Sequence, residues 1–139
     1  MKIKLLKTYN ILITGLLSIL GFAIACDSMD EYGTPTAKFI VNGKVKSSKT
    51  NQPIENIRVS MLYDTTYTDK NGAYQVVETG EIHNIYNIEF KDIDGETNGE
   101  FNNLDTVIEF KNPKFTGGDG NWYKGETSKE YDIKLTPKK

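Results

Sequence analysis

Apolar and polar residues alternate along most of the chain after residue 38. The alternation falls in six runs, at residues 39–45, 57–63, 74–76, 86–90, 104–110 and 131–135. A period of two places every second side chain on the same face of a β-strand. Residues 38–139 show no convincing helical face. The pattern therefore predicts an all-β domain, an antiparallel β-sandwich of six or seven short strands that each bury one face.

Two of the segments between these runs contain residues that favour turns. Asp69-Lys70-Asn71-Gly72 supplies residues that tolerate a positive φ, and it predicts a tight hairpin between the strands on either side. Asn51-Gln52-Pro53 is expected to close the connection between the first two strands. In the second run, the spacing places Ile57, Val59, Met61 and Tyr63 on the buried face.

The first 25 residues follow a different pattern. Lys2, Lys4 and Lys7 precede an almost wholly apolar stretch at residues 11–25. A positive leader followed by such a stretch is typical of a secretory signal peptide. The apolar stretch is shorter than the roughly 20 residues that a permanent membrane span needs. We therefore expect residues 1–25 to be a cleaved signal peptide.

Cys26 is the only cysteine in the chain, and it follows Ala23-Ile24-Ala25. This arrangement resembles the lipobox of bacterial lipoproteins, in which the thiol receives diacylglycerol and the leader is cut off just before it. The resemblance implies that Cys26 carries diacylglycerol and N-acyl (palmitate-type) chains, which together would anchor the protein stably. The alternatives are a buried cysteine of the signal helix and a free thiol left by ordinary cleavage.

Residues 26–37 are polar, and Gly33 and Pro35 interrupt them. They predict a tether between the lipid and the domain at 38–139. The acidic stretch "DSMDE" resembles the surface-export signal of Bacteroidota lipoproteins, which implies an outer-membrane, surface-exposed location. The alternative is a solvated linker that carries no signal.

Loss of residues 1–25 removes three lysines and no acidic residue, which takes the formal net charge from −2 to −5. An acidic domain lacks the basic surface that nucleic-acid binding requires. We therefore expect no nucleic-acid partner.

The stretch from residue 43 to residue 76 resembles the carboxypeptidase regulatory-like domain, a transthyretin-like sandwich of seven strands. The positions that carry the resemblance are Gly43, Val45, Pro53, Ile54, Ile57, Val59, Thr68, Asp69, Gly72 and Tyr74. Most domains of this family are non-catalytic structural modules, so the resemblance implies a structural role.

A wider resemblance rests on the lipobox and on the stretches "EYGTPTAKFIVNGKV", "DIDGETNGEF" and "NWYKGETSKEYDIKL". Together they look like the lipoproteins of Bacteroidota that are encoded beside a radical SAM enzyme. The resemblance implies a cell-envelope location and a sandwich fold. It also implies a radical SAM enzyme as a partner.

An acidic stretch at residues 91–105 is the first candidate site. Calcium prefers six to eight oxygen ligands, which a glycine-bent acidic loop can supply. The spacing of glycines and acids excludes an EF-hand, and the alternative is a solvated turn between two strands. The predicted ligands are Asp92, Asp94, Glu96, Asn98, Glu100 and Asp105.

A second candidate lies at residues 115–126, a glycine-rich segment. Trp122 and Tyr123 bring two aromatic rings to a polar segment, where they could stack on a sugar or a peptide. The alternative is that the tryptophan folds back and caps the core.

Catalytic arrangements are largely absent from the sequence. His83 is the only histidine, and the serines lie outside any Gly-x-Ser-x-Gly motif. We therefore expect no enzyme and no obligatory cofactor. Two functions remain: a lipid-anchored module that binds or scaffolds an envelope protein or glycan, and a substrate of the radical SAM enzyme. A hydrolase is the least favoured alternative.

Overall fold

The computed structural model describes residues 2–24 and 33–139, which belong to two compact units. The first unit contains one helix, α1 (Lys2–Ile24). In the described parts of the chain, no helix has the length and hydropathy that crossing a membrane requires. Cys26 and residues 27–32 of the expected tether lie outside the described residues.

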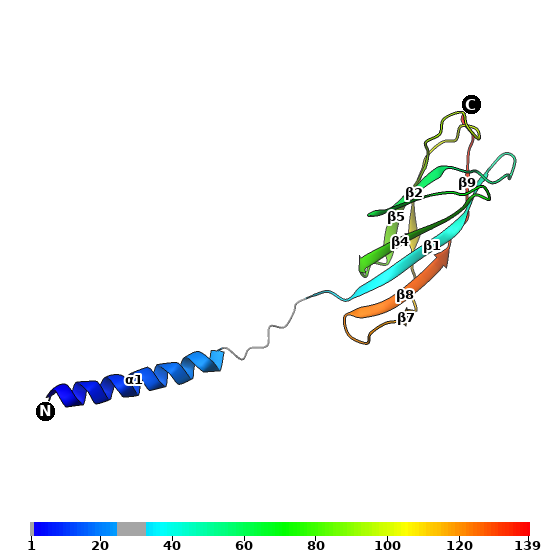
Figure 1. The fold of residues 1–139 in the computed structure, drawn as a ribbon. Coiled ribbons are helices and arrows are strands. Elements are labelled where there is room, and N and C mark those ends of the chain that lie inside the picture. The colour runs from blue at the N-terminus through cyan, green and yellow to red at the C-terminus, as the bar shows by residue number, and fades with distance from the viewer. Residues whose placement is uncertain (1, 25–32) are drawn as a thin grey trace. The chain divides into compact units, whose positions relative to one another are not determined.

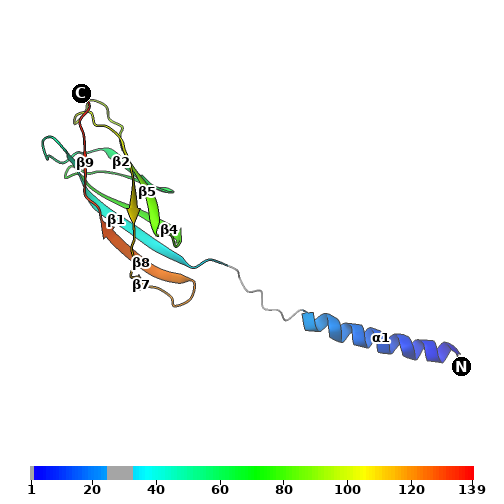
Figure 2. The ribbon, with the colours of Figure 1, turned by 180° about the vertical axis from the view of Figure 1, so that it is seen from behind.

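The second unit, Gly33–Lys139, is a β-sandwich of two sheets (Figures 1 and 2). The first sheet has the order β4-β1-β8-β7, with β9 also paired to β1, and the second has the order β3-β2-β5-β6. The strands are β1 (Thr36–Ser47), β2 (Ile57–Met61), β3 (Asp64–Tyr67), β4 (Ala73–Glu81), β5 (Ile85–Asp92), β6 (Leu104–Glu109), β7 (Thr116–Gly117), β8 (Tyr123–Glu130) and β9 (Ile133–Leu135).

The all-β fold with two sheets is confirmed, but the expectation of seven antiparallel strands is wrong. Nine strands are present in the described residues, and β1 pairs in parallel with both β8 and β9. The additional strands escaped the sequence pattern because they are short or polar. β3 has four residues, β7 has two, and β8 reads YKGETSKE. A strand with so few apolar residues gives no alternating signal.

β1 is the central strand of the first sheet. Its antiparallel pairing with β4 runs from Thr36↔Glu81 to Lys44↔Ala73. On its other edge it pairs first with β8 and then, from Val45↔Ile133 onward, with β9. Its inward side chains Phe39, Val41 and Val45 face the second sheet and are completely buried.

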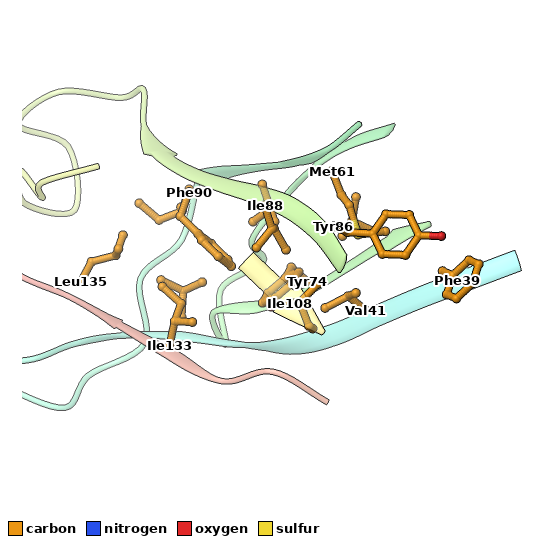
Figure 3. Close-up of a cluster of buried hydrophobic side chains, with 14 of the residues drawn as sticks. Phe39, Val41, Met61, Tyr74, Tyr86, Ile88, Phe90, Ile108, Ile133 and Leu135 are labelled. Atoms are coloured by element: carbon orange, nitrogen blue, oxygen red, sulfur yellow. The ribbon is translucent and has the colours of Figure 1, made fainter. Parts of the chain in front are cut away.

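The core lies between the two sheets, as the alternation predicts. Figure 3 shows side chains of β1 and β5 pointing toward one another across the sandwich. One end of the core is aromatic, because the ring centroid of Phe39 lies 4.8 Å from that of Tyr86, 5.1 Å from that of Phe110 and 5.7 Å from that of Phe115. The buried apolar residues are Ala37, Phe39, Val41, Val45, Ile54, Ile57, Val59, Met61, Tyr74, Val76, Tyr86, Ile88, Phe90, Phe101, Ile108, Phe110, Ile133 and Leu135.

The second apolar run ends earlier than predicted. Tyr63 is 95% exposed, so its expected burial is wrong. β2 ends at Met61, which pairs with Asp64 of β3 across a two-residue turn. Leu62 in that turn has a φ of 49°, which removes the following residue from the strand alternation. The two-residue period therefore fails where the hairpin begins.

The turn at residues 69–72 forms, but it does not make a hairpin within one sheet. It connects β3 of the second sheet to β4 of the first. The Asp69 carboxylate accepts hydrogen bonds from the backbone N–H groups of Asn71 (2.8 Å) and Ala73 (2.9 Å). Gly72 has a φ of 70°, and a Cβ there would lie 2.4 Å from the Val45 carbonyl oxygen. A glycine is therefore required for the chain to pass between the sheets.

Thr68 also helps to hold this corner. Its hydroxyl accepts a hydrogen bond from the Ile57 N–H (2.9 Å) and donates one to the Ile54 carbonyl (2.7 Å), and the side chain is buried. Together with Asp69 and Gly72, Thr68 belongs to the motif that resembles the carboxypeptidase regulatory-like domain. In this chain the three residues act in folding.

A close crossing separates β8 from β9. The Tyr131 N–H donates to the Asn42 carbonyl (2.7 Å), and the Tyr74 hydroxyl donates to the Tyr131 carbonyl (2.6 Å). Gly43 lies at this crossing, where the Tyr131 backbone is too close for any side chain. Burial, followed by the proximity of Tyr131 and Asp132, raises the pKa of Tyr74, so its hydroxyl stays protonated and keeps this donor.

Candidate functional site

The acidic loop uses two of its carboxylates to hold its own backbone and side chains. The Asp92 carboxylate accepts hydrogen bonds from the backbone N–H groups of Phe101 (2.7 Å) and Asp94 (3.3 Å). The Asp94 carboxylate accepts from the side-chain amides of Asn98 (3.0 Å) and Asn56 (3.4 Å). Partial burial, more than the contact with Asp94, raises the pKa of Asp92, although the Phe101 N–H opposes this shift.

The structure does not bring the six predicted calcium ligands together. Glu96 and Glu100 are exposed in the loop, whereas Asp105 lies on β6 opposite Glu89 of β5. In residues 2–24 and 33–139, no three histidine, cysteine or acidic side chains are placed to hold a metal ion. Calcium binding stays a prediction from the sequence. The hydrogen bonds of Asp92 and Asp94 give both residues a role in folding.

The loop that carries Trp122 and Tyr123 is an ordered turn between β7 and β8. The Asp119 carboxylate accepts hydrogen bonds from the N–H groups of Asn121 (2.8 Å) and Tyr123 (3.1 Å), and the Asp119 N–H donates to the Tyr123 carbonyl (3.0 Å). Tyr123 is the first residue of β8 and is partly buried. Trp122 is 47% exposed and does not belong to the core cluster, so it does not cap the core.

A groove of about 570 Å³ lies along β8, and no motif in the sequence predicts it. One wall is formed by β8 residues Thr127, Ser128 and Lys129, and the other by the segment at 109–116, which includes Phe110 and Lys114. The Lys129 ammonium donates to the Glu109 carbonyl (2.6 Å) and so connects the edges of the two sheets at the groove. We call this feature the β8 groove.

The wall of the β8 groove formed by β8 includes unpaired backbone. β7 covers β8 only at Gly125 and Glu126. Within the described residues, Thr127–Glu130 therefore have β1 as their only strand partner. Alternate residues of a strand bond to the same neighbour, and the Tyr131 N–H faces β1. By this alternation, the backbone N–H and C=O groups of Ser128 and Glu130 point away from β1.

Of the three lysines that line the β8 groove, only Lys111 pairs with a carboxylate in the described residues. The carboxylate of Glu126 pairs with Lys38 (3.3 Å), and that of Glu109 pairs with Lys111 (3.4 Å). Within the described part of the chain, Lys114 forms no ion pair. The groove therefore combines a free strand edge with an available positive charge.

A second, open depression of about 530 Å³ lies on the outer face of the second sheet. Its lining combines the side chains of Leu62 and Val107 with those of Asn87 and Asp105. Glu89, which also lines it, pairs with Arg58 (3.0 Å). It lies over strands β2, β5 and β6, and β6 is an edge strand of this sheet.

His83 gives no sign of an active site. Its side chain is exposed, and the centroid of its ring lies 6.1 Å from that of Tyr86. The Tyr86 hydroxyl accepts a hydrogen bond from the His83 backbone N–H (3.3 Å). Burial raises the pKa of Tyr86, with a smaller opposing effect from this hydrogen bond. The arrangement anchors the loop before β5. The absence of catalysis stays a prediction.

No model of a known protein family matches the chain, and no curated protein matches it.

Proposed function

We propose that this protein is a lipid-anchored, non-catalytic module of the cell envelope that binds an extended segment of a partner protein along β8. The free strand edge beside the β8 groove carries the proposal, because strand addition uses unpaired N–H and C=O groups together with adjacent pockets. The non-catalytic role is also supported by the resemblance to transthyretin-like, carboxypeptidase regulatory-like domains.

The geometry fits a strand that continues the line of β7. β7 ends after two residues, and the β8 groove begins beside it with Thr116 and Glu126 in its lining. A segment laid along Thr127–Glu130 would satisfy the outward backbone groups of Ser128 and Glu130. Lys114 on the opposite wall favours a carboxylate in the bound segment.

Replacing Ser128 with proline tests this function. Proline removes the N–H that points away from β1, and edge strands tolerate proline at such positions. Ser128→Ala is the matched control, because it removes the same hydroxyl but keeps the N–H. We expect envelope extracts to yield one discrete partner with the parent and with Ser128→Ala, and at least tenfold less with Ser128→Pro, about 1.4 kcal/mol. Equal capture by all three folded proteins would contradict strand addition.

The membrane anchor is tested separately by replacing Cys26 with serine. A hydroxyl cannot take the place of the thiol in lipidation, so the variant should lose both lipid and leader cleavage. We expect the parent to partition into the detergent phase at its mature mass, and Cys26→Ser to remain a longer precursor. Cleavage at the same position and the same partitioning in the two proteins would rule out the lipid anchor.

A further inference from the structure

Trp122 lies at the point where the chain enters the sandwich. Its carbonyl accepts a hydrogen bond from the Thr36 N–H (2.8 Å). Its ring borders Gly33, where an added Cβ would lie 3.8 Å from the ring atom Cζ3. The ring is about half exposed and is not part of the core cluster. The packing of the sandwich therefore does not explain a tryptophan at this position.

Other exposed apolar and cationic side chains belong to segments at this end of the sandwich, where β1 and β8 begin and β4 ends. Thr36 pairs with Glu81 at the end of β4, and β5 then begins with Ile85, which is 59% exposed. The Phe110 N–H donates to the Asn84 carbonyl (2.7 Å), which holds the segment with exposed Lys111 and Lys114 beside the same loop. We call Trp122, Ile85, Lys111, Lys114 and Lys124 the entry end.

The distance along the chain from Cys26 limits how far the entry end can lie from a membrane. Six residues separate Cys26 from Gly33, and a fully extended chain spans at most about 25 Å over the seven peptide steps between them. β1 then carries the chain away over 12 residues, about 40 Å, to the opposite end of the sandwich. The acidic loop and the C-terminus lie at that opposite end (Figure 1). The lipid anchor of the proposed function is a premise here.

We propose that the entry end rests on the lipid headgroup layer, with the Trp122 ring in the membrane interface. Tryptophan is enriched at this depth because its ring is apolar and its N–H is polar. Lysines can place their apolar stems along the interface while the ammonium groups stay in water. The tether keeps the entry end close to the bilayer. A contact that is too weak to bring the free protein to the membrane can therefore still form.

The contact would orient the sandwich with β1 and β8 rising from the membrane. The β8 groove shares Lys111 and Lys114 with the entry end and extends from there along β8, where a neighbouring envelope protein can reach Thr127–Glu130. The acidic loop would point away from the bilayer. The lipid and the entry end therefore have separate roles: the lipid retains the protein, and the entry end sets its orientation.

Trp122 is the only tryptophan and Cys26 the only cysteine in the chain, which allows a direct test. The core residues all lie between Ala37 and Leu135, so residues 26–139 contain the complete folding unit. This chain is coupled through Cys26 to a maleimide lipid in phosphatidylcholine vesicles. We expect Trp122 emission to shift to shorter wavelength, and phosphatidylcholine with brominated acyl chains to quench it by at least half.

The matched control moves the tryptophan to the opposite end of the sandwich. The double variant Trp122→Phe, Lys49→Trp places it in the exposed turn after β1, and its emission should be neither shifted nor quenched. Equal quenching at the two positions, or none at Trp122, would overturn the proposed orientation. Chemical coupling holds the protein on the vesicle in every case. The outcome is therefore independent of the Cys26→Ser result, which tests the anchor in the cell.

Discussion

Replacing Gly43 with alanine is expected to destabilise the sandwich strongly. The new Cβ would lie 2.0 Å from the Tyr131 carbonyl oxygen and 3.1 Å from the Tyr74 ring. The carbonyl belongs to the backbone between β8 and β9, so it cannot move aside without disturbing their pairing with β1. We expect a loss of about 3 kcal/mol or more in the free energy of unfolding, measured by urea denaturation.

Gly80→Ala is the matched control for Gly43→Ala. Gly80 lies in β4, and its added Cβ would meet only the end of the Glu78 side chain, at 3.4 Å. A change of less than about 0.5 kcal/mol is expected there. Equal urea midpoints for Gly43→Ala and Gly80→Ala would contradict the close approach of the Tyr131 backbone to Gly43.

Replacing Phe39 with alanine is expected to destabilise the domain by about 3 to 5 kcal/mol. The Phe39 ring is completely buried and meets the rings of Tyr86, Phe110 and Phe115. Alanine leaves a cavity that these rings fill only in part, and two of the lost contacts are edge-to-face. Because domains of this size are stable by only about 5 to 15 kcal/mol, thermal melting should show a large decrease in Tm.

Val107→Ala provides the comparison for the Phe39 variant. Val107 lies on β6, in the same sandwich, but its side chain is exposed. Its removal should change the free energy of unfolding by less than about 0.5 kcal/mol. Similar melting of the two variants would contradict the aromatic packing at this end of the core.

The core could be predicted from the sequence, because burial on one face of a strand leaves a two-residue period. Val41, Val59, Ile88 and Ile108 are buried as the pattern indicated. The period failed at Tyr63, because a two-residue turn changes which face the next side chain occupies. The two-residue period also missed β8, whose main strand partner is β1 and whose side chains are mostly exposed.

The candidate sites were harder to predict, because each depends on which segments meet in space. Asp92 and Asp94 are attractive calcium ligands in sequence, yet their oxygens accept hydrogen bonds from nearby backbone and amide groups. Trp122 was singled out for its aromatic ring, but its position next to Gly33 follows from the pairing of β8 with β1. The β8 groove left no motif, since a free backbone edge does not depend on residue type.

The parallel pairing of β1 with β8 and β9 joins the beginning of the domain to its end. Closing contacts between residues so distant in sequence is slow, because the entropy of the intervening chain must be lost first. In a growing polypeptide, β1 and β4 are both synthesised early and can pair. The other edge of β1 stays unpaired until β8 and β9 have been synthesised. A chain truncated before Tyr123 would expose that edge of β1 and be prone to aggregation.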